Sequence, residues 1–347
     1  MPAMKFFEAI RDAYLQTMRA YPEVYIVGVG VIDPKAVFGS LNGLLEEFGE
    51  DRIVEGPLAE QMLTGFSFAS ATLGMRPVLI HHRVDFLPLT MDQIVNHCAK
   101  WSYMFGGQQH VPMVIRGIVG RGWGNGPQHT QSLHSLMANV PGLKVVVPSN
   151  PADAKGLMIS AILDNDPVIY IDHRSLHNDT GEVPSGIFEV PIGKAKIIRE
   201  GNDLTLVAVG PMVKEALVAA EVYAESGFSI EIIDLHTIRP LDYKTVIKSI
   251  QKTGHLIIAD ADWPYFGVSA ALISQISQHA FGTLKKAPKV ISWPDHPVPA
   301  TYVLDKDYYP TATHITHAIA EFFNKKLEMN VNKPTQVTHS GVNIGPF

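Results

Sequence analysis

The chain has 347 residues, of which 46% are hydrophobic and 18% charged, and its formal net charge is −6. This length suffices for two domains with cores of their own, and the composition is that of a globular protein. The negative charge, without a run of lysines or arginines, argues against nucleic acid or an anionic membrane as the main partner.

The sequence also lacks the features of a membrane or secreted protein. No apolar stretch reaches the length of a bilayer span, and the first residues, MPAMKFFEAI, lack the charged and apolar regions of a signal peptide. The single cysteine, Cys98, cannot form an internal disulfide. Together these features predict a cytoplasmic, reducing location and no membrane contact.

Short apolar runs alternate with segments of helical period, which is the pattern of a mostly parallel sheet covered by helices. Two helices are predicted in the first half, at 91–105 and 151–164. The second follows Ser149-Asn150-Pro151, where Ser149 or Asn150 suits the N-cap and Pro151 the first turn. The predicted strands of this half are 24–31, 76–82, 112–118, 144–149 and 167–172.

The pattern fades after His173 and then returns. The second alternation predicts strands at 204–210, 229–235, 255–261 and 289–293, with helices at 212–226, 242–252, 268–281 and 313–327. The fold class is therefore α/β with two domains. The predicted organisation is a first domain over 1–185, a linker over 186–202, a second domain over 203–328 and a tail over 329–347.

Generic motifs carry little information here. Gly28 and Gly30 follow a strand, but Asp33 stands at the third glycine position of a dinucleotide-binding loop, so that fingerprint fails. The chain has no GxSxG elbow, P-loop or HExxH motif. The pairs His81-His82 and His129…His134 do not have zinc-site spacing, and we interpret them as loop or helix-surface histidines.

Two segments are more informative. In VEGPLAEQMLTGFSFASATLG (54–74), Glu60 falls near the start of a helix, where the helix dipole alone accounts for a carboxylate. In RGIVGRGWGNGPQHTQSLHSL (116–136), glycines at 120, 122, 124 and 126 form a loop that ends just before His129. Such loops often border active sites because the backbone can approach a ligand closely, although a surface loop also fits.

Around these segments the chain resembles the beta subunits of thiamine diphosphate-dependent 2-oxo acid dehydrogenases. The likeness runs from about residue 4 to about residue 327 and implies a pyrimidine-binding thiamine-enzyme fold followed by a transketolase C-terminal-like domain. The matching signatures are LLEEFGEDRIVEGPLAEQ (44–61), MDQIVNHCAKWSYMFGGQ (91–108), VPMVIRG (111–117), QHTQSLHSLMANVPGLKVVVPSNPADAKGL (128–157), IDLHTIRPLD (233–242) and DYYPTATHI (307–315).

The resemblance implies a role for three residues. Glu60 matches the glutamate that exchanges a proton with the aminopyrimidine ring of thiamine diphosphate, and Phe86 matches the aromatic residue that packs on that ring. His129 matches a beta-chain histidine that reaches the reacting centre as a proton donor.

The family also often holds a structural monovalent cation such as K⁺, bound mainly by backbone carbonyls. Asp166 departs from a more usual Asn at this site. The matching positions here are Met113, Ala161, Ile162, Asp164 and Asp166.

One absence bears on the partner. Thiamine enzymes anchor the diphosphate through Mg²⁺, using a Gly-Asp-Gly sequence that occurs nowhere in this chain. A diphosphate needs compensating charge, so the metal half of the site is expected to come from another chain. In the family that chain is the alpha subunit, which holds Mg²⁺ and shares the cofactor in an α2β2 heterotetramer.

The leading hypothesis is therefore the beta subunit of an acyl-transferring 2-oxo acid dehydrogenase, which decarboxylates a 2-oxo acid and passes the acyl group to a lipoyl carrier on an acyltransferase core. The alternatives are a split transketolase or carboligase acting on sugar phosphates, and a scaffold chain without activity. His81, His82 and Arg83 are more basic than the usual family residues there. A phosphate or carboxylate on the substrate and a solvated surface both account for them.

Overall fold

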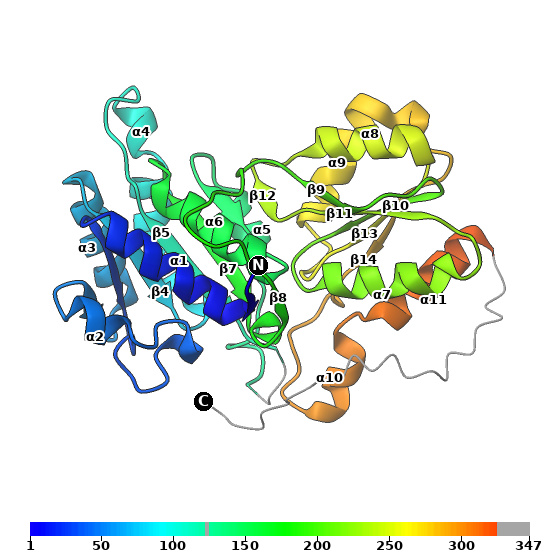
Figure 1. Ribbon diagram of the computed structural model, residues 1–347. Coiled ribbons are helices and arrows are strands. Elements are labelled where there is room, and N and C mark those ends of the chain that lie inside the picture. Colours follow the sequence, from blue (N-terminus) through cyan, green and yellow to red (C-terminus); the bar gives the residue numbers. More distant parts are fainter. Residues whose placement is uncertain (122–124, 325–347) are drawn as a thin grey trace. The chain divides into compact units, whose positions relative to one another are not determined.

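The computed structural model describes residues 1–121 and 125–324 (Figure 1). The predicted tail at 329–347, and Gly122 and Gly124 of the glycine-rich loop, lie outside the described residues. The chain forms two compact units. The first comprises residues 1–120, 132–193 and 237–240, and the second comprises 121–131, 194–236 and residues from 241 on.

A seven-stranded sheet forms the centre of the first unit. Its order is β12-β6-β7-β5-β4-β2-β3, and all neighbours are parallel except β12, which pairs antiparallel with β6. A separate antiparallel pair joins β1 (Ala3–Lys5) to β8 (Thr180–Glu182). The strands of the large sheet are β2 (Val24–Gly28), β3 (Ile53–Glu55), β4 (Arg76–His81), β5 (Val114–Val119), β6 (Lys144–Val146), β7 (Val168–His173) and β12 (Thr237–Arg239). All five strands predicted for the first half are confirmed.

Helices cover this sheet. They are α1 (Phe6–Ala20), η1 (Val37–Gly39), α2 (Leu44–Phe48), α3 (Glu60–Thr72), η2 (Val84–Thr90), the π-helix η3 (Asp92–Cys98), α4 (Trp101–Met104), α5 (His134–Ala138), α6 (Pro151–Leu163) and η4 (Arg174–Leu176). Helix α1 packs against α6, and both contribute to one hydrophobic core with the sheet strands. The helix predicted at 151–164 is confirmed. Its N-cap is Asn150, whose side chain accepts a hydrogen bond from the backbone of Asp153, and Pro151 begins the helix.

The single helix predicted at 91–105 is wrong in detail, because the structure divides it into η3 and α4 around Ala99 and Lys100. The Ala99 carbonyl oxygen packs directly on Gly142, where a Cβ atom would come within 1.8 Å of it. The backbone of Gly142 is also left-handed, with φ of +99°. The break between η3 and α4 thus coincides with a close backbone contact to Gly142. The hydrophobic period of residues 91–105 contains no information about that contact.

The second unit contains a five-stranded sheet of order β14-β13-β10-β11-β9, parallel except for the edge strand β9. Helices α7 and α11 share a hydrophobic core with the sheet, while α8 packs against β10 and α9 (Figure 1). The elements are β9 (Lys196–Arg199), β10 (Leu204–Ala208), α7 (Met212–Ala224), β11 (Ile230–Asp234), α8 (Tyr243–Thr253), β13 (Leu256–Ala259), α9 (Val268–Ala280), η5 (Phe281–Thr283), β14 (Lys289–Ile291), α10 (Tyr302–Tyr308) and α11 (Ala312–Phe323).

Both units are α/β, which confirms the predicted fold class. All four strands and four helices predicted for the second half are present, and α10 and β9 were not predicted. Within residues 1–121 and 125–324, no helix is both long and apolar enough to cross a membrane.

The Gly142 contact predicts a specific loss of stability. The substitution Gly142→Ala should lower the free energy of unfolding by about 1–3 kcal/mol more than Gly74→Ala, because only the first adds overpacking to backbone strain. Gly74 is the matched control, since its φ is +97° and no atom lies within 4 Å of the added Cβ. Urea unfolding followed by circular dichroism measures both, and equal losses would contradict the contact.

Candidate functional site

Glu60 is the first residue of α3 and follows a turn in which the Ala59 N–H donates to the Pro57 carbonyl at 2.7 Å. A Cβ atom on Gly56 would come within 2.5 Å of the Leu63 side chain, so glycine lets the turn pack against the helix that it precedes. The Glu60 side chain is half-buried, and its carboxylate makes no hydrogen bond or ion pair with the described residues. Helix α3 therefore presents an unpaired carboxylate at its positive end.

Phe86 lies on the neighbouring helix η2, which follows β4 and packs against α3. Its backbone N–H donates to the carbonyl of Arg83 at 3.2 Å, and its ring is half-buried. The first unit thus brings together the helices that carry two of the three predicted site residues, close to the carboxyl end of a parallel strand. That edge of an α/β sheet is where ligands usually bind.

The third predicted residue, His129, belongs to the second unit. Its backbone N–H donates to the Gly126 carbonyl at 3.3 Å, and the Thr130 hydroxyl donates to the same carbonyl at 2.5 Å. Gly126 has φ of +70°, so the end of the glycine-rich loop uses the left-handed region that glycine favours. The imidazole of His129 is half-buried.

Two of the histidines that we interpreted as surface residues are buried, and for these the interpretation is wrong. His81 ends β4 and is only 4% exposed, and His134 begins α5 with no exposed surface. Burial, and then the neighbouring His82, lower the pKa of His81 to about 4. His81 is therefore neutral near pH ~7.

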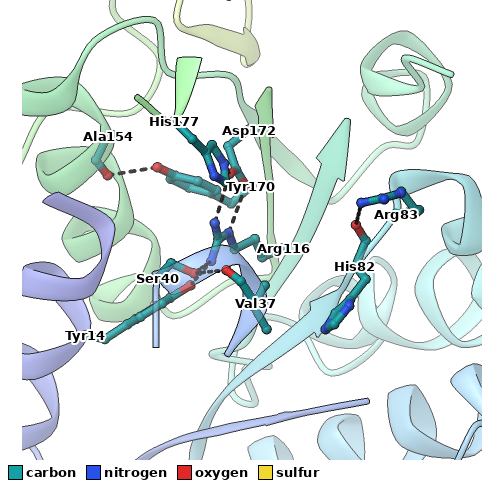
Figure 2. Close-up of polar contacts among 10 residues, drawn as sticks. All are labelled: Tyr14, Val37, Ser40, His82, Arg83, Arg116, Ala154, Tyr170, Asp172 and His177. Atoms are coloured by element: carbon teal, nitrogen blue, oxygen red, sulfur yellow. Dashed lines mark hydrogen bonds and ion pairs between the residues drawn. The ribbon is translucent and has the colours of Figure 1, made fainter. Parts of the chain in front are cut away.

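Sequence reasoning missed a polar network inside the sheet, which Figure 2 shows. Arg116 on β5 and Asp172 on β7 are fully buried, and the guanidinium binds both carboxylate oxygens at 2.8 and 2.9 Å. The remaining Arg116 nitrogen donates to the Ser40 hydroxyl at 2.7 Å and more weakly to Tyr14 at 3.4 Å. His177 completes the network at 2.6 Å from Asp172.

The charges in this network stabilise each other. Burial alone would raise the pKa of Asp172, but the charge and hydrogen bonds of Arg116, together with the His177 hydrogen bond, hold it below its usual range. Both groups therefore remain ionised in the interior. The sequence did contain a sign of this buried pair, because Arg116 stands within the apolar run PMVIRGI and Asp172 within the apolar run PVIYID.

Several of the five predicted cation ligands lie beside positive side chains. Arg76 donates through one nitrogen to the carbonyls of Ile162 and Asp164, both at 2.9 Å, and Lys144 binds the Asp164 carboxylate at 2.7 Å. Lys144 also reaches the Asp166 carboxylate at 3.3 Å. The Met113 carbonyl accepts the β7 hydrogen bond from Val168. Each carbonyl keeps a second lone pair, so these contacts leave coordination capacity at the carbonyls.

Comparison with known proteins identifies the class. Residues 2–179 match the transketolase pyrimidine-binding domain, and residues 193–315 match the transketolase C-terminal domain. The chain belongs to the transketolase-like family that combines these two domains.

Several relatives within this family are named as beta subunits. It is 40% identical over 320 residues to the beta subunit of acetoin:2,6-dichlorophenolindophenol oxidoreductase from Cupriavidus necator, a match that covers 89% of this chain and 94% of that protein. It is 38% identical to the Bacillus subtilis protein of the same name, with 92% and 96% covered. It is 37% identical to the pyruvate dehydrogenase E1 component subunit beta of Rickettsia felis, with 90% and 96% covered. The family resemblance seen in the sequence is thereby confirmed.

A solved structure described as a split gene transketolase in an inactive beta4 tetramer has the same fold. The TM-score is 0.76 at 20% identity, over 93% of this chain and 99% of that one. At this identity the likeness shows the fold alone.

The buried ion pair predicts a large loss of stability. The substitution Asp172→Asn should lower the free energy of unfolding by about 3–5 kcal/mol, because it leaves the Arg116 charge buried and uncompensated. Glu47→Gln removes one partner of the exposed Arg19–Glu47 pair and should leave the free energy nearly unchanged. Urea unfolding of both variants tests this, and a similar small effect for each would count against the network.

The buried His81 predicts that the free energy of unfolding depends on pH. Its pKa is lowered in the folded chain, so between pH ~6.5 and the folded value of about 4 the unfolded chain binds the extra proton, and stability falls as the pH falls. Lowering the pH from about 7 to about 5 should remove about 2 kcal/mol through His81. His81→Asn should reduce this loss in urea unfolding, whereas the exposed His317→Asn should not.

Proposed function

We propose that this chain is the beta subunit of a heteromeric 2-oxo acid dehydrogenase that uses thiamine diphosphate. The observation that carries the proposal is the position of Glu60 at the start of α3, in the domain that matches the pyrimidine-binding model. Its half-buried carboxylate has no partner among the described residues. The names of the relatives favour this function over the split transketolase alternative.

The residues of the first unit fit the aminopyrimidine half of the cofactor. The Glu60 carboxylate can hold or move a proton at a ring nitrogen, and Phe86 offers a half-buried ring on the adjacent helix for packing. When bound, the cofactor supplies the electron sink for decarboxylation. His129 is the proposed donor of a proton to the substrate.

The chain offers no Gly-Asp-Gly anchor for a metal-bound diphosphate. We therefore place Mg²⁺ and the diphosphate on an alpha-type subunit, in an α2β2 assembly whose acyl group goes to a lipoyl acyltransferase core. The beta-subunit names of the relatives support a partner of this kind. We also propose that K⁺ binds carbonyl oxygens near Arg76. Two of the carbonyls there, those of Ile162 and Asp164, accept hydrogen bonds from the Arg76 guanidinium.

The proposed role of Glu60 has a direct test. In the complex of this chain with its alpha-type partner, Glu60→Gln should lower 2-oxo acid turnover by about 10²–10⁴-fold, because the amide cannot exchange the proton. Turnover is measured with an artificial electron acceptor. Glu46→Gln, which changes another first-turn glutamate on α2, should have no effect.

The shared site is tested separately by calorimetric titration of thiamine diphosphate and Mg²⁺. We expect binding by the pair and none by this chain alone. Tight binding and turnover by this chain without a partner would contradict the assignment of the diphosphate to another subunit.

A further inference from the structure

Two arginines lie side by side at the carboxyl edge of the first unit's sheet. Arg83 follows the end of β4, and Arg174 follows the end of β7. Their guanidinium carbons lie 5.1 and 4.6 Å from the ring centroid of the same residue, Phe38. Figure 2 places His82 and Arg83 together beyond β4, and the His82 ring is 5.9 Å from the Phe38 ring. Two chain segments therefore gather basic groups around the phenyl ring of a third.

The donor groups of these side chains are largely unused in the described part of the chain. Within the described residues neither Arg83 nor Arg174 forms an ion pair, and the Arg174 guanidinium makes no hydrogen bond. Arg83 donates only to the carbonyl of His82, and its Nε atom is buried without a partner. The Nε2 atom of His82 is likewise buried without a partner. Half-buried arginines normally satisfy their donors, so these point to a group that the described residues do not supply.

The surrounding charges support this interpretation. Burial lowers the pKa of Arg174, and the nearby Arg83 charge lowers it further, which Asp172 only partly offsets. Asp172 is already bound by Arg116 and His177. Burial also lowers the pKa of Arg83, although the Asp85 charge raises it in part. Burial and the Arg83 charge lower the pKa of His82, and the charges of Asp33 and Glu55 raise it in part. An anion would relieve the repulsion between the two guanidinium groups.

We infer that Arg83 and Arg174, with His82, form a subsite for an oxyanion group of the substrate, a carboxylate or a phosphate. Guanidinium groups bind both through paired hydrogen bonds. The position suits a substrate group, because Arg83 lies three residues before Phe86 and its carbonyl accepts the Phe86 N–H. This inference rests on the proposed function and specifies its substrate class.

The subsite suits a group that keeps its charge during the reaction. The carboxylate lost as CO₂ gives up its negative charge in the transition state, so two cations on it would stabilise the ground state and slow the reaction. The expected substrate is therefore a 2-oxo acid with a second anionic group at its far end, in place of a short neutral side chain.

Binding to the full chain tests the subsite without any thiamine chemistry. Inorganic phosphate and succinate are titrated calorimetrically into wild type, Arg83→Gln, Arg174→Gln and the double variant. The double variant should lose at least about tenfold in affinity for the preferred anion, as expected for charge-assisted hydrogen bonds. The stronger of the two wild-type ligands identifies the group as phosphate or carboxylate.

Controls separate the subsite from general effects. Arg52→Gln removes another guanidinium beside a phenyl ring, 5.2 Å from Phe48, and should leave anion affinity unchanged. Arg83→Lys and Arg174→Lys keep the charge and should retain part of the affinity if the glutamine variants fail to fold. Absence of measurable binding in wild type, or equal affinity in wild type and the folded double variant, would overturn the inference.

Turnover by the complex with the alpha-type partner distinguishes this inference from the proposed function. The double variant should lower kcat/KM for 2-oxoglutarate or phosphohydroxypyruvate by about tenfold or more relative to kcat/KM for pyruvate, which carries no second anionic group. If anion binding depends on both arginines but the complex does not turn over any 2-oxo acid, the proposed function is contradicted and the oxyanion subsite is supported. If the double variant leaves turnover of both 2-oxoglutarate and phosphohydroxypyruvate unchanged, the subsite alone is contradicted.

Discussion

The buried ion pair between Arg116 and Asp172 organises the carboxyl edge of the first sheet. It joins the neighbouring strands β5 and β7, and through Ser40 it also holds the segment that follows β2. The Ser40 hydroxyl in turn donates to the Val37 carbonyl at 2.9 Å, where Val37 and Phe38 both have positive φ angles (Figure 2). Two non-glycine residues in this region store strain, and the network of hydrogen bonds around Arg116 opposes its release.

This anchoring connects the core to the proposed chemistry. The strained segment presents the Phe38 ring to Arg83 and Arg174, so the position of the basic cluster depends on a charge pair buried behind it. On the same edge, η2 carries Phe86 and packs against α3, which begins with Glu60. A rigid sheet thus fixes groups that the proposal assigns to cofactor and to substrate, as precise binding requires.

The sequence predicted most of the regular elements because their hydrophobic periods are strong. Every predicted strand exists, and Asn150 and Pro151 begin α6 as local capping chemistry requires. The helix at 91–105 was divided, since its break involves the Ala99 carbonyl packing on Gly142, forty-three residues away. The short strand β12 was missed for a related reason, because three residues acquire strand geometry only by pairing with β6.

The amino-acid sequence by itself predicted the α/β class and two domains, because hydrophobic periodicity is a local property of the chain. Its resemblance to a known family implied Glu60, Phe86 and His129 as candidate site residues. Only the tertiary structure decided that Arg116 pairs with Asp172, that His81 is buried, and that Arg83 and Arg174 share one ring. Arg116 and Asp172 are 56 positions apart in the sequence, and Arg83 and Arg174 are 91 positions apart. Burial and charge pairing depend on which strands become neighbours, and that order is a property of the folded sheet.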